Sequence, residues 1–263
     1  MRGRAAGCVL GLALGDALGA PFEFRRAADV PDPIPALELP WGRLPPGSWT
    51  DDTAMALNLV RSLVDRGGFD PDDVLVRHVA WLASAPPDVG NQTRQALSLA
   101  APGRPSDEAA RIVWERRGPE VSAGNGSVMY CAPLGVAFAR RPEGLVEAAP
   151  ALSAITHWDG RCRTACLAVT LTVAALVRGE SAEPAVRASL DAVLEREGGE
   201  ELEFLTAEAG RARPVDGPDQ GFCLFAAGIA LRAAAEAPTA EAGLRSVVAL
   251  GGDTDTNAAV AGA

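Results

Sequence analysis

Two short clusters of carboxylate and hydroxyl side chains lie at nearly opposite ends of this 263-residue chain. The first is Thr50-Asp51-Asp52-Thr53, and the second is Asp253-Thr254-Asp255-Thr256. Carboxylate and hydroxyl oxygens are the ligands that hard divalent cations such as Mg²⁺ and Mn²⁺ prefer. If the fold brings the two clusters together, they would form a metal centre for two divalent cations.

The first cluster also has an ordinary structural explanation as a helix cap. Thr50 is a good N-cap residue, and acidic residues are common in first helical turns. Free N–H groups and the helix dipole would keep Asp51 and Asp52 ionised there. Taken alone, this cluster therefore favours the cap over the metal site.

The second cluster shifts the balance towards a shared site. Asp253 and Asp255 are two residues apart, so on an ideal helix their side chains would point about 200° apart. They can converge only in a loop or at a helix start, and Gly251-Gly252 supplies the loop. A cap needs one such residue, so two caps with the same surplus of acids are less plausible than one metal site.

The first helix that must position these clusters carries a stripe of glycines. Gly7, Gly11, Gly15 and Gly19 recur every fourth residue, and Pro21 ends the helix. Glycine destabilises a helix, so such a stripe indicates that another backbone or a ligand packs very close to it.

The remaining apolar spacing predicts an all-α fold, with one domain over 1–263. Met55, Leu59 and Leu63 form an i, i+4 row on a second helix that Thr50 opens and Gly67-Gly68 ends. The proline-rich residues 25–47 predict a loop. Further helices are expected over 71–84, 91–100, 106–117, 127–140, 144–156, 161–178, 182–197, 221–236 and 239–249.

Composition argues against several classes of partner. The net charge of −10 disfavours a nucleic-acid groove or an anionic membrane surface. The apolar residues from Ala5 to Gly15 resemble a signal peptide, but Asp16 interrupts them and the stretch is too short to span a bilayer. We therefore expect a cytoplasmic protein, with a monomer favoured.

The five cysteines are odd in number and lack a framework spacing, which favours a reducing compartment. Cys162 and Cys166 lie one helical turn apart and close to His157, a pattern that permits a zinc site. The spacing matches no common zinc motif, so small buried apolar side chains are the simpler interpretation.

Five segments resemble those of the ADP-ribosylglycohydrolase family, which includes dinitrogenase reductase-activating glycohydrolases and ADP-ribosyl-acceptor hydrolases. The signature segments are Gly15–Glu23, Gly47–Thr53 and Gly251–Thr256, and Gly124–Gly135 and Thr156–Asp159 are similar to two further ones. Gly90-Asn91-Gln92-Thr93 is a weaker match that would border the pocket. The resemblance implies an all-helical fold that removes ADP-ribose from a modified acceptor at a binuclear Mg²⁺ or Mn²⁺ centre.

Carried over by position, the resemblance implies the metal ligands Thr50, Asp51, Asp52, Asp253, Asp255 and Thr256. It implies a catalytic set of Glu23, Asp51 and Asp52. Metal-bound water would attack the anomeric ribose carbon, and Asp52 or Glu23 would accept its proton. Glu23 and four aspartates carry −5, which two divalent cations would offset with +4.

The resemblance also implies substrate contacts by Gly124, Asn125, Gly126, Ser127 and His157. The glycine-rich segment precedes a predicted helix, where free N–H groups suit a phosphate, although an ordinary turn has the same composition. His157 contacts ADP-ribose or is structural, and His78 is expected to be structural. Trp158 stacks on adenine or belongs to the core, and the residues do not separate these two roles.

The substrate would be an ADP-ribosylated protein or a small ADP-ribose conjugate. Hydrolysis of a derivative such as O-acetyl-ADP-ribose is an alternative, and so is a non-catalytic crystallin-like or ligand-binding relative. The chain ends seven residues after Thr256, whereas members of the family usually continue into further helix. The last helix is therefore expected to be short or to lack a packing partner.

Overall fold

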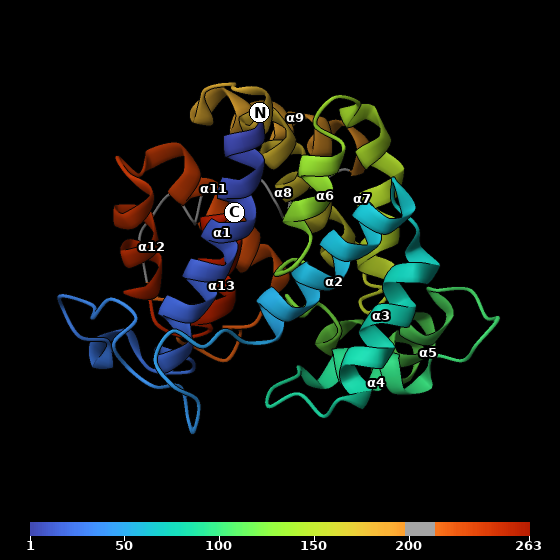
Figure 1. Cartoon of the computed structure of the whole chain (residues 1–263), viewed down its shortest axis with the longest axis horizontal. Helices are drawn as coiled ribbons and strands as arrows, with labels where there is room; N and C mark the ends of the chain where they lie inside the picture. Colours follow the sequence, from blue (N-terminus) through green and yellow to red (C-terminus); the bar gives the residue numbers. More distant parts are fainter. Residues whose placement is uncertain (198–213) are drawn as a thin grey trace.

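The computed structural model describes residues 1–197 and 214–263, and these residues form helices joined by loops (Figure 1). In these ranges the only β-type pairs are three isolated bridges, and no strand is present. The predicted all-α fold is therefore confirmed.

The α-helices are α1 (Arg2–Gly19), α2 (Asp51–Arg66), α3 (Pro71–Ala83), α4 (Asn91–Leu99), α5 (Glu108–Arg117), α6 (Ala132–Ala137), α7 (Leu145–Ala154), α8 (Gly160–Arg178), α9 (Ala182–Glu197), α11 (Cys223–Glu236), α12 (Ala240–Val248) and α13 (Thr254–Gly262). Short 3₁₀ helices lie at Ala20–Phe22, Ala27–Asp29, Pro119–Val121 and Pro142–Gly144. Most of these bounds differ from the predicted ones by no more than two residues. That the chain forms one domain stays a prediction.

The predicted helix over 127–140 is the main error. Residues 125–130 form turns, in which the carbonyl of Asn125 accepts from the N–H groups of Val128 at 2.8 Å and Met129 at 3.2 Å. Pro133 has no N–H to donate, so it is tolerated in the first turn of a helix. Accordingly α6 begins at Ala132.

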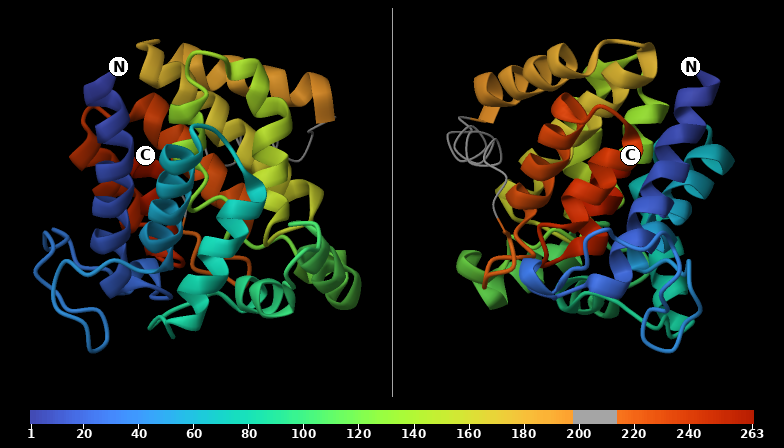
Figure 2. Two further views of the ribbon diagram at one scale, coloured as in Figure 1. Left: turned by 45° about the vertical axis from the view of Figure 1, so that its right-hand side comes forward. Right: turned by 90° about the vertical axis from the view of Figure 1, so that its left-hand side faces the viewer.

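The core is built around α8, which packs against α6, α7, α9 and α11 (Figure 2). Its fully buried residues include Cys166 and Leu167, and Tyr130 and Leu152 are buried beside it in the same apolar cluster. Two segments, Arg2–Phe22 and α8, are long and apolar enough to span a bilayer. Buried core helices share this property, and α8 is mostly buried. Length and composition are therefore weak evidence for a membrane span.

The glycine stripe of α1 packs against α13, and the two helices lie side by side in both views of Figure 2. A Cβ at Gly11, Gly15 or Gly19 would overlap backbone atoms of α13. Gly7 has no atom within 4 Å of the place that a Cβ would take. The close neighbour is thus another backbone, and α13, although only nine residues long, also packs against α11 and α12.

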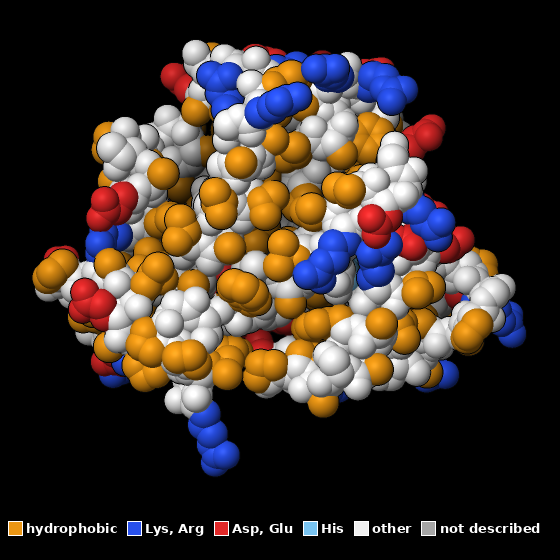
Figure 3. Space-filling model, viewed as in Figure 1, with side chains coloured by type: hydrophobic (Ala, Val, Ile, Leu, Met, Phe, Trp, Pro, Cys, Tyr) orange, Lys and Arg blue, Asp and Glu red, His pale blue; other side chains and the backbone are white. Residues whose placement is uncertain are grey.

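The opposite side of α1 faces outwards. Leu10 and Leu14 are 63% and 49% exposed, and apolar side chains are frequent among the scattered charged ones on this face of the molecule (Figure 3). The helix is therefore covered on its glycine side and open on its leucine side.

Candidate metal centre

The two acidic clusters lie at the N-terminal ends of two helices that meet. Thr50 caps α2 by accepting from the backbone N–H of Asp52 at 3.4 Å, and Asp253 is the N-cap residue of α13. The Oγ1 of Thr256 donates to Oδ2 of Asp52 at 3.5 Å, across 204 residues of sequence. The structure thus brings together the clusters that the sequence separates.

The loop before α13 is fixed by its two glycines. Gly251 and Gly252 have φ values of 69° and 73°, which are costly for other residues. The N–H of Gly252 donates to the carbonyl of Arg25 at 2.8 Å, and the N–H of Phe24 donates back to the carbonyl of Gly252 at 2.7 Å. This pairing holds the loop beside Glu23, which follows α1.

The carboxylates present a donor set suited to cations. One ligand atom each from Glu23, Asp253 and Asp255 lies within 4.8 Å of the others. The Oδ1 atoms of Asp52 and Asp255 are buried and have no hydrogen-bond partner. Burying an anionic oxygen without a partner costs several kcal/mol, so a bound divalent cation would fit these residues.

Burial also changes the acidity of the cluster. Desolvation raises the pKa of Asp51, Asp52 and Asp255 well above the ordinary value, and the charges of neighbouring carboxylates raise it further. Ionising these carboxyl groups is therefore harder than ionising exposed ones, and divalent cations would compete with protons for them.

Asp88 is a member of this group that sequence reasoning missed. Burial raises the pKa of Glu23 to about 7, and the charge of Asp88 is the next largest cause. The same charge raises the pKa of Asp51. The one signal in the sequence was that Asp88 lies two residues before the weakly matched segment that begins at Gly90. In the structure, the N–H of Gly90 donates to Oδ2 of Asp51 at 3.2 Å.

A cleft of about 450 Å³ opens over the carboxylates. It is lined by Glu23, Phe24, Asp51, Asp88, Val89, Gly90, Asn91, Gln92, Thr93, Arg117, Val121, Gly124, Asn125, Gly126, Met129, His157, Asp253, Asp255 and Thr256. Among the predicted residues, Thr50 and Asp52 are buried and lie outside this lining. The weakly matched segment 90–93 does border the cleft.

The glycine-rich segment faces the cleft, although not at a helix start. A Cβ at Gly126 would lie 2.8 Å from Cε1 of His157, so a side chain there would displace the imidazole. Asn125 donates from Nδ2 to Oδ2 of Asp253 at 2.8 Å. Asn125 therefore holds a carboxylate of the candidate metal centre, and the missing side chains of Gly124 and Gly126 leave room for the ring of His157.

Ser127 lies in the core instead of on the cleft. Its hydroxyl is 2.9 Å from Oγ of Ser153 and accepts from Sγ of Cys166 at 3.5 Å. The backbone turns inwards here because residues 125–130 form turns. Residues 124–127 therefore do not lie at the start of a helix, and their contact with a substrate stays a prediction.

His157 and Arg117 line the same cleft as the carboxylates. Burial and the positive charge of Arg117 lower the pKa of His157 to about 3, so the ring is neutral near pH 7. Arg117 donates from Nη2 to the carbonyl of Val121 at 2.7 Å, while its Nε is buried without a partner. Among the described residues that line this cleft, Arg117 is the one arginine.

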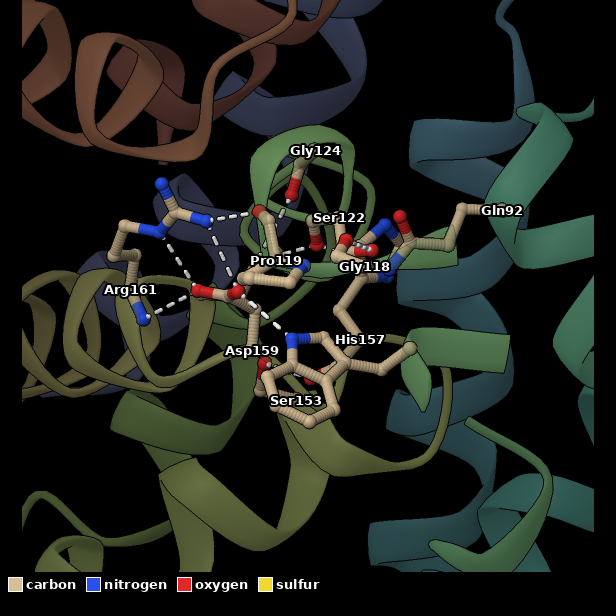
Figure 4. Close-up of polar contacts among 11 residues, drawn as sticks. Gln92, Gly118, Pro119, Ser122, Gly124, Ser153, His157, Asp159 and Arg161 are labelled. Carbon is tan, nitrogen blue, oxygen red and sulfur yellow. Dashed lines mark hydrogen bonds and ion pairs between the residues drawn. The ribbon is translucent and has the colours of Figure 1, made fainter. Parts of the chain in front are cut away.

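A polar network beside His157 fixes the position of this part of the cleft (Figure 4). Asp159 accepts from Nε of Arg161 at 2.8 Å and from Nε1 of Trp114 at 3.0 Å. Arg161 also donates to the carbonyl of Pro119 at 2.5 Å. The start of α8 is thereby tied to the segment that leads to Gly124.

The sequence left the roles of Trp158 and of the pair Cys162 and Cys166 open, and the structure places all three side chains in apolar packing. Trp158 packs against a cluster that includes Val113, and the guanidinium carbon of Arg163 lies 3.9 Å from its ring centroid. Cys162 and Cys166 are buried, and the thiol of Cys162 donates to the carbonyl of Gly124 at 3.2 Å. In the described part of the chain, the residues grouped closely enough for a shared ion are the three carboxylates named above.

Comparison with known proteins places the chain in a family. The sequence model of the ADP-ribosylglycohydrolase family matches residues 1–263. The chain therefore belongs to the ADP-ribosylglycohydrolase family, as its signature segments indicate. A solved structure described as an ADP-ribosylglycohydrolase-related protein complex has a TM-score of 0.78 and 34% sequence identity, covering 98% of this chain and 84% of its own.

Two curated relatives carry names that state an activity. Over 180 residues the chain is 36% identical to ADP-ribosyl-[dinitrogen reductase] glycohydrolase of Rhodospirillum rubrum. The matched region covers 67% of this chain and 58% of that protein. Over 142 residues it is 35% identical to ADP-ribosylarginine hydrolase Tri1 of Pseudomonas putida (strain GB-1). This matched region covers 51% of this chain and 36% of that protein. The chain thus spans less than two thirds of the length of either protein.

Proposed function

We propose that this chain is a hydrolase that releases ADP-ribose from a modified acceptor, with two Mg²⁺ or Mn²⁺ ions at the junction of α2 and α13. The observation that carries the proposal is the pair of buried, unpartnered oxygens on Asp52 and Asp255. Asp255 lines a cleft wide enough for a small molecule, and Asp52 lies buried outside that lining. The names of the relatives support the type of reaction.

The cations would be held by Thr50, Asp51, Asp52, Asp253, Asp255 and Thr256. When bound, they would supply Lewis-acid chemistry, lowering the pKa of water and binding ribose hydroxyls. Glu23 and the four aspartates of the two clusters would carry −5, which two divalent cations would offset with +4; Asp88 adds one further carboxylate to the cleft.

Glu23 is assigned as the group that accepts a proton from the attacking water. It lines the cleft, whereas Asp52 is buried and lies outside the lining. A carboxylate at the cleft that is not buried among the cation ligands can accept a proton from water. In the reaction the bond between the anomeric carbon and the acceptor breaks, water oxygen bonds to that carbon, and the acceptor leaves with a proton.

The part of the cleft lined by His157 and Arg117 would bind the anionic part of the substrate. Arg117 supplies positive charge at a cleft whose other charged lining residues, in the described part of the chain, are carboxylates, and ADP-ribose carries a pyrophosphate. Gly124, Gly126 and the ring of His157 that packs against them line the cleft and would lie beside the ribose or the phosphates. A cytoplasmic location belongs to this proposal, in line with five buried free cysteines, and so does a monomeric state.

The test is release of ADP-ribose from a panel of conjugates: arginine-linked and serine-linked protein, and O-acetyl-ADP-ribose. We expect activity with Mg²⁺ or Mn²⁺, loss of activity in EDTA, and recovery when the cation is returned. Full activity in EDTA would contradict the metal assignment. Turnover of O-acetyl-ADP-ribose alone would replace the protein substrate by a small conjugate.

A further inference from the structure

Asp16 on α1 is a buried carboxylate that contacts the metal centre through backbone and hydroxyl donors. Its side chain is fully buried and accepts from the N–H of Thr50 at 2.9 Å and the N–H of Thr53 at 3.0 Å. The Oγ1 of Thr53 donates to the same carboxylate at 2.5 Å. An acid of one helix thus occupies the N-terminus of the next.

This arrangement leaves the carboxylates of Asp51 and Asp52, in the first turn of α2, available to bind cations. The N–H groups of a first helical turn attract the nearest carboxylates, which here would be Asp51 and Asp52. Asp16 takes the donors of Thr50 and Thr53, and the hydroxyl of Thr50 takes the N–H of Asp52. Consequently Oδ1 of Asp52 is buried with no partner of its own.

The next turn of α1 holds the start of α13, which carries Asp253 and Asp255. The carbonyl of Gly19 accepts from Oγ1 of Thr254 at 2.8 Å. Because Gly15 and Gly19 lack a Cβ, the backbone of α13 can approach closely. Residues 16 to 19 of α1 therefore fix both ligand-bearing helix starts, and Glu23 follows four residues later.

A purely structural cap would not need this charge. A serine or threonine hydroxyl also caps a helix, whereas a buried carboxylate beside Asp51 and Asp52 adds repulsion in the absence of cations. The repulsion becomes useful when a cation binds, because a further negative charge strengthens its attraction. The position and charge of Asp16 are both explained by a role towards the cations.

We propose that Asp16 is a positioning residue of the metal centre, which occupies the N–H groups of α2 so that Asp51 and Asp52 can bind cations. The inference rests on the proposed function, because it assumes cation binding by these carboxylates. Asp16 itself is not assigned as a ligand.

The test is Mn²⁺ binding by the full chain, measured by titration calorimetry for the wild type and Asp16→Asn. Asparagine keeps the shape but replaces one acceptor oxygen by an NH₂ donor that faces N–H groups. We expect Mn²⁺ affinity to fall about 10- to 100-fold, as for loss of other outer-shell partners of a metal ligand. The far-ultraviolet circular dichroism should remain helical.

A second pair of variants covers the case in which Asp16→Asn fails to fold. Thr53→Val removes one donor to Asp16, and Thr53→Ser keeps it. We expect weaker Mn²⁺ binding in the valine variant and near wild-type binding in the serine variant. Equal affinity in both would overturn the inference.

The outcomes also separate the two proposals. A lower melting temperature without metal, together with unchanged Mn²⁺ affinity in Asp16→Asn, would show a structural role only and overturn the inference alone. If the wild type takes up no Mn²⁺ at all, the proposed function fails, and the inference fails with it.

Discussion

Asn125 donates a hydrogen bond of 2.8 Å from Nδ2 to Oδ2 of Asp253, although 128 residues separate them in the sequence. The contact links the glycine-rich segment, which borders the cleft, to a carboxylate of the candidate metal centre. The amide of Asn125 orients one oxygen of Asp253. Because the amide is neutral, it does not offset the charge of the carboxylate, which stays available to a cation.

Replacement of Asn125 by alanine tests this contact. Without the amide, Asp253 loses its fixed orientation, and we expect Mn²⁺ affinity to fall about 10-fold or more. Titration calorimetry measures the change, with Gln95→Ala on the exposed surface of α4 as a control. Unchanged affinity in Asn125→Ala would show that the backbone alone orients Asp253.

Asp255→Asn should abolish turnover and leave the helical fold intact. The unpartnered Oδ1 of Asp255 is buried, so neutralising this side chain removes a cation ligand and relieves repulsion. The loss should exceed the about 10- to 100-fold cost of losing an outer-shell partner. ADP-ribose release and circular dichroism are measured on the same preparation, and retained turnover would remove Asp255 from the centre.

Gly15→Ala and Gly7→Ala should change stability in opposite directions. A methyl group at Gly15 would overlap the backbone at Ala258, so overpacking should cost about 1–3 kcal/mol. Gly7 is exposed with open space around it, so alanine there should stabilise α1 by about 0.5–1 kcal/mol. Urea unfolding gives both values. A stabilised Gly15→Ala variant would contradict the close packing of α1 and α13.

Arg117→Gln should weaken ADP-ribose binding without changing Mn²⁺ affinity. A charge-assisted hydrogen bond contributes about 1.5–3 kcal/mol, which corresponds to about 10- to 100-fold in affinity. Binding of ADP-ribose is measured in saturating Mn²⁺, and the exposed Arg116→Gln is the matched control. Equal binding by both variants would place the phosphates elsewhere in the cleft.

His78 should make the protein less stable in acid. Burial lowers the pKa of His78 from 6.5 to about 3, so the folded ring stays neutral while the unfolded ring takes up a proton. The stability from this group is present above about pH 6.5 and is lost as the pH falls towards 3. His78→Phe keeps an aromatic ring against Tyr130 and removes the titration.

The measurement for His78 is the free energy of unfolding at pH 7.5 and at pH 5 for both proteins. The other histidine and the carboxylates are common to both, so the difference between the two pH slopes isolates His78. The slope should be smaller in the phenylalanine variant. Equal slopes would show that the folded ring takes up its proton as readily as the unfolded one.

The helices and their ends were largely predictable because their signals are local. Thr50 and Gly67 mark the two ends of α2 by their own backbone and side-chain preferences. The late start of α6 was missed because the turns at 125–130 depend on hydrogen bonds that apolar spacing does not reveal. The same turns move Ser127 into the core.

The sequence by itself determined the two acidic clusters, the glycine loop before the second and the need for a close neighbour along α1. Those features follow from residue type and short-range spacing. Only the tertiary structure decided that α13 is that neighbour, that Asp88 lies beside Glu23, and that Asp16 occupies the start of α2. Such contacts join residues that are tens or hundreds of positions apart, and packing of the helices, not local preference, sets the distances between them.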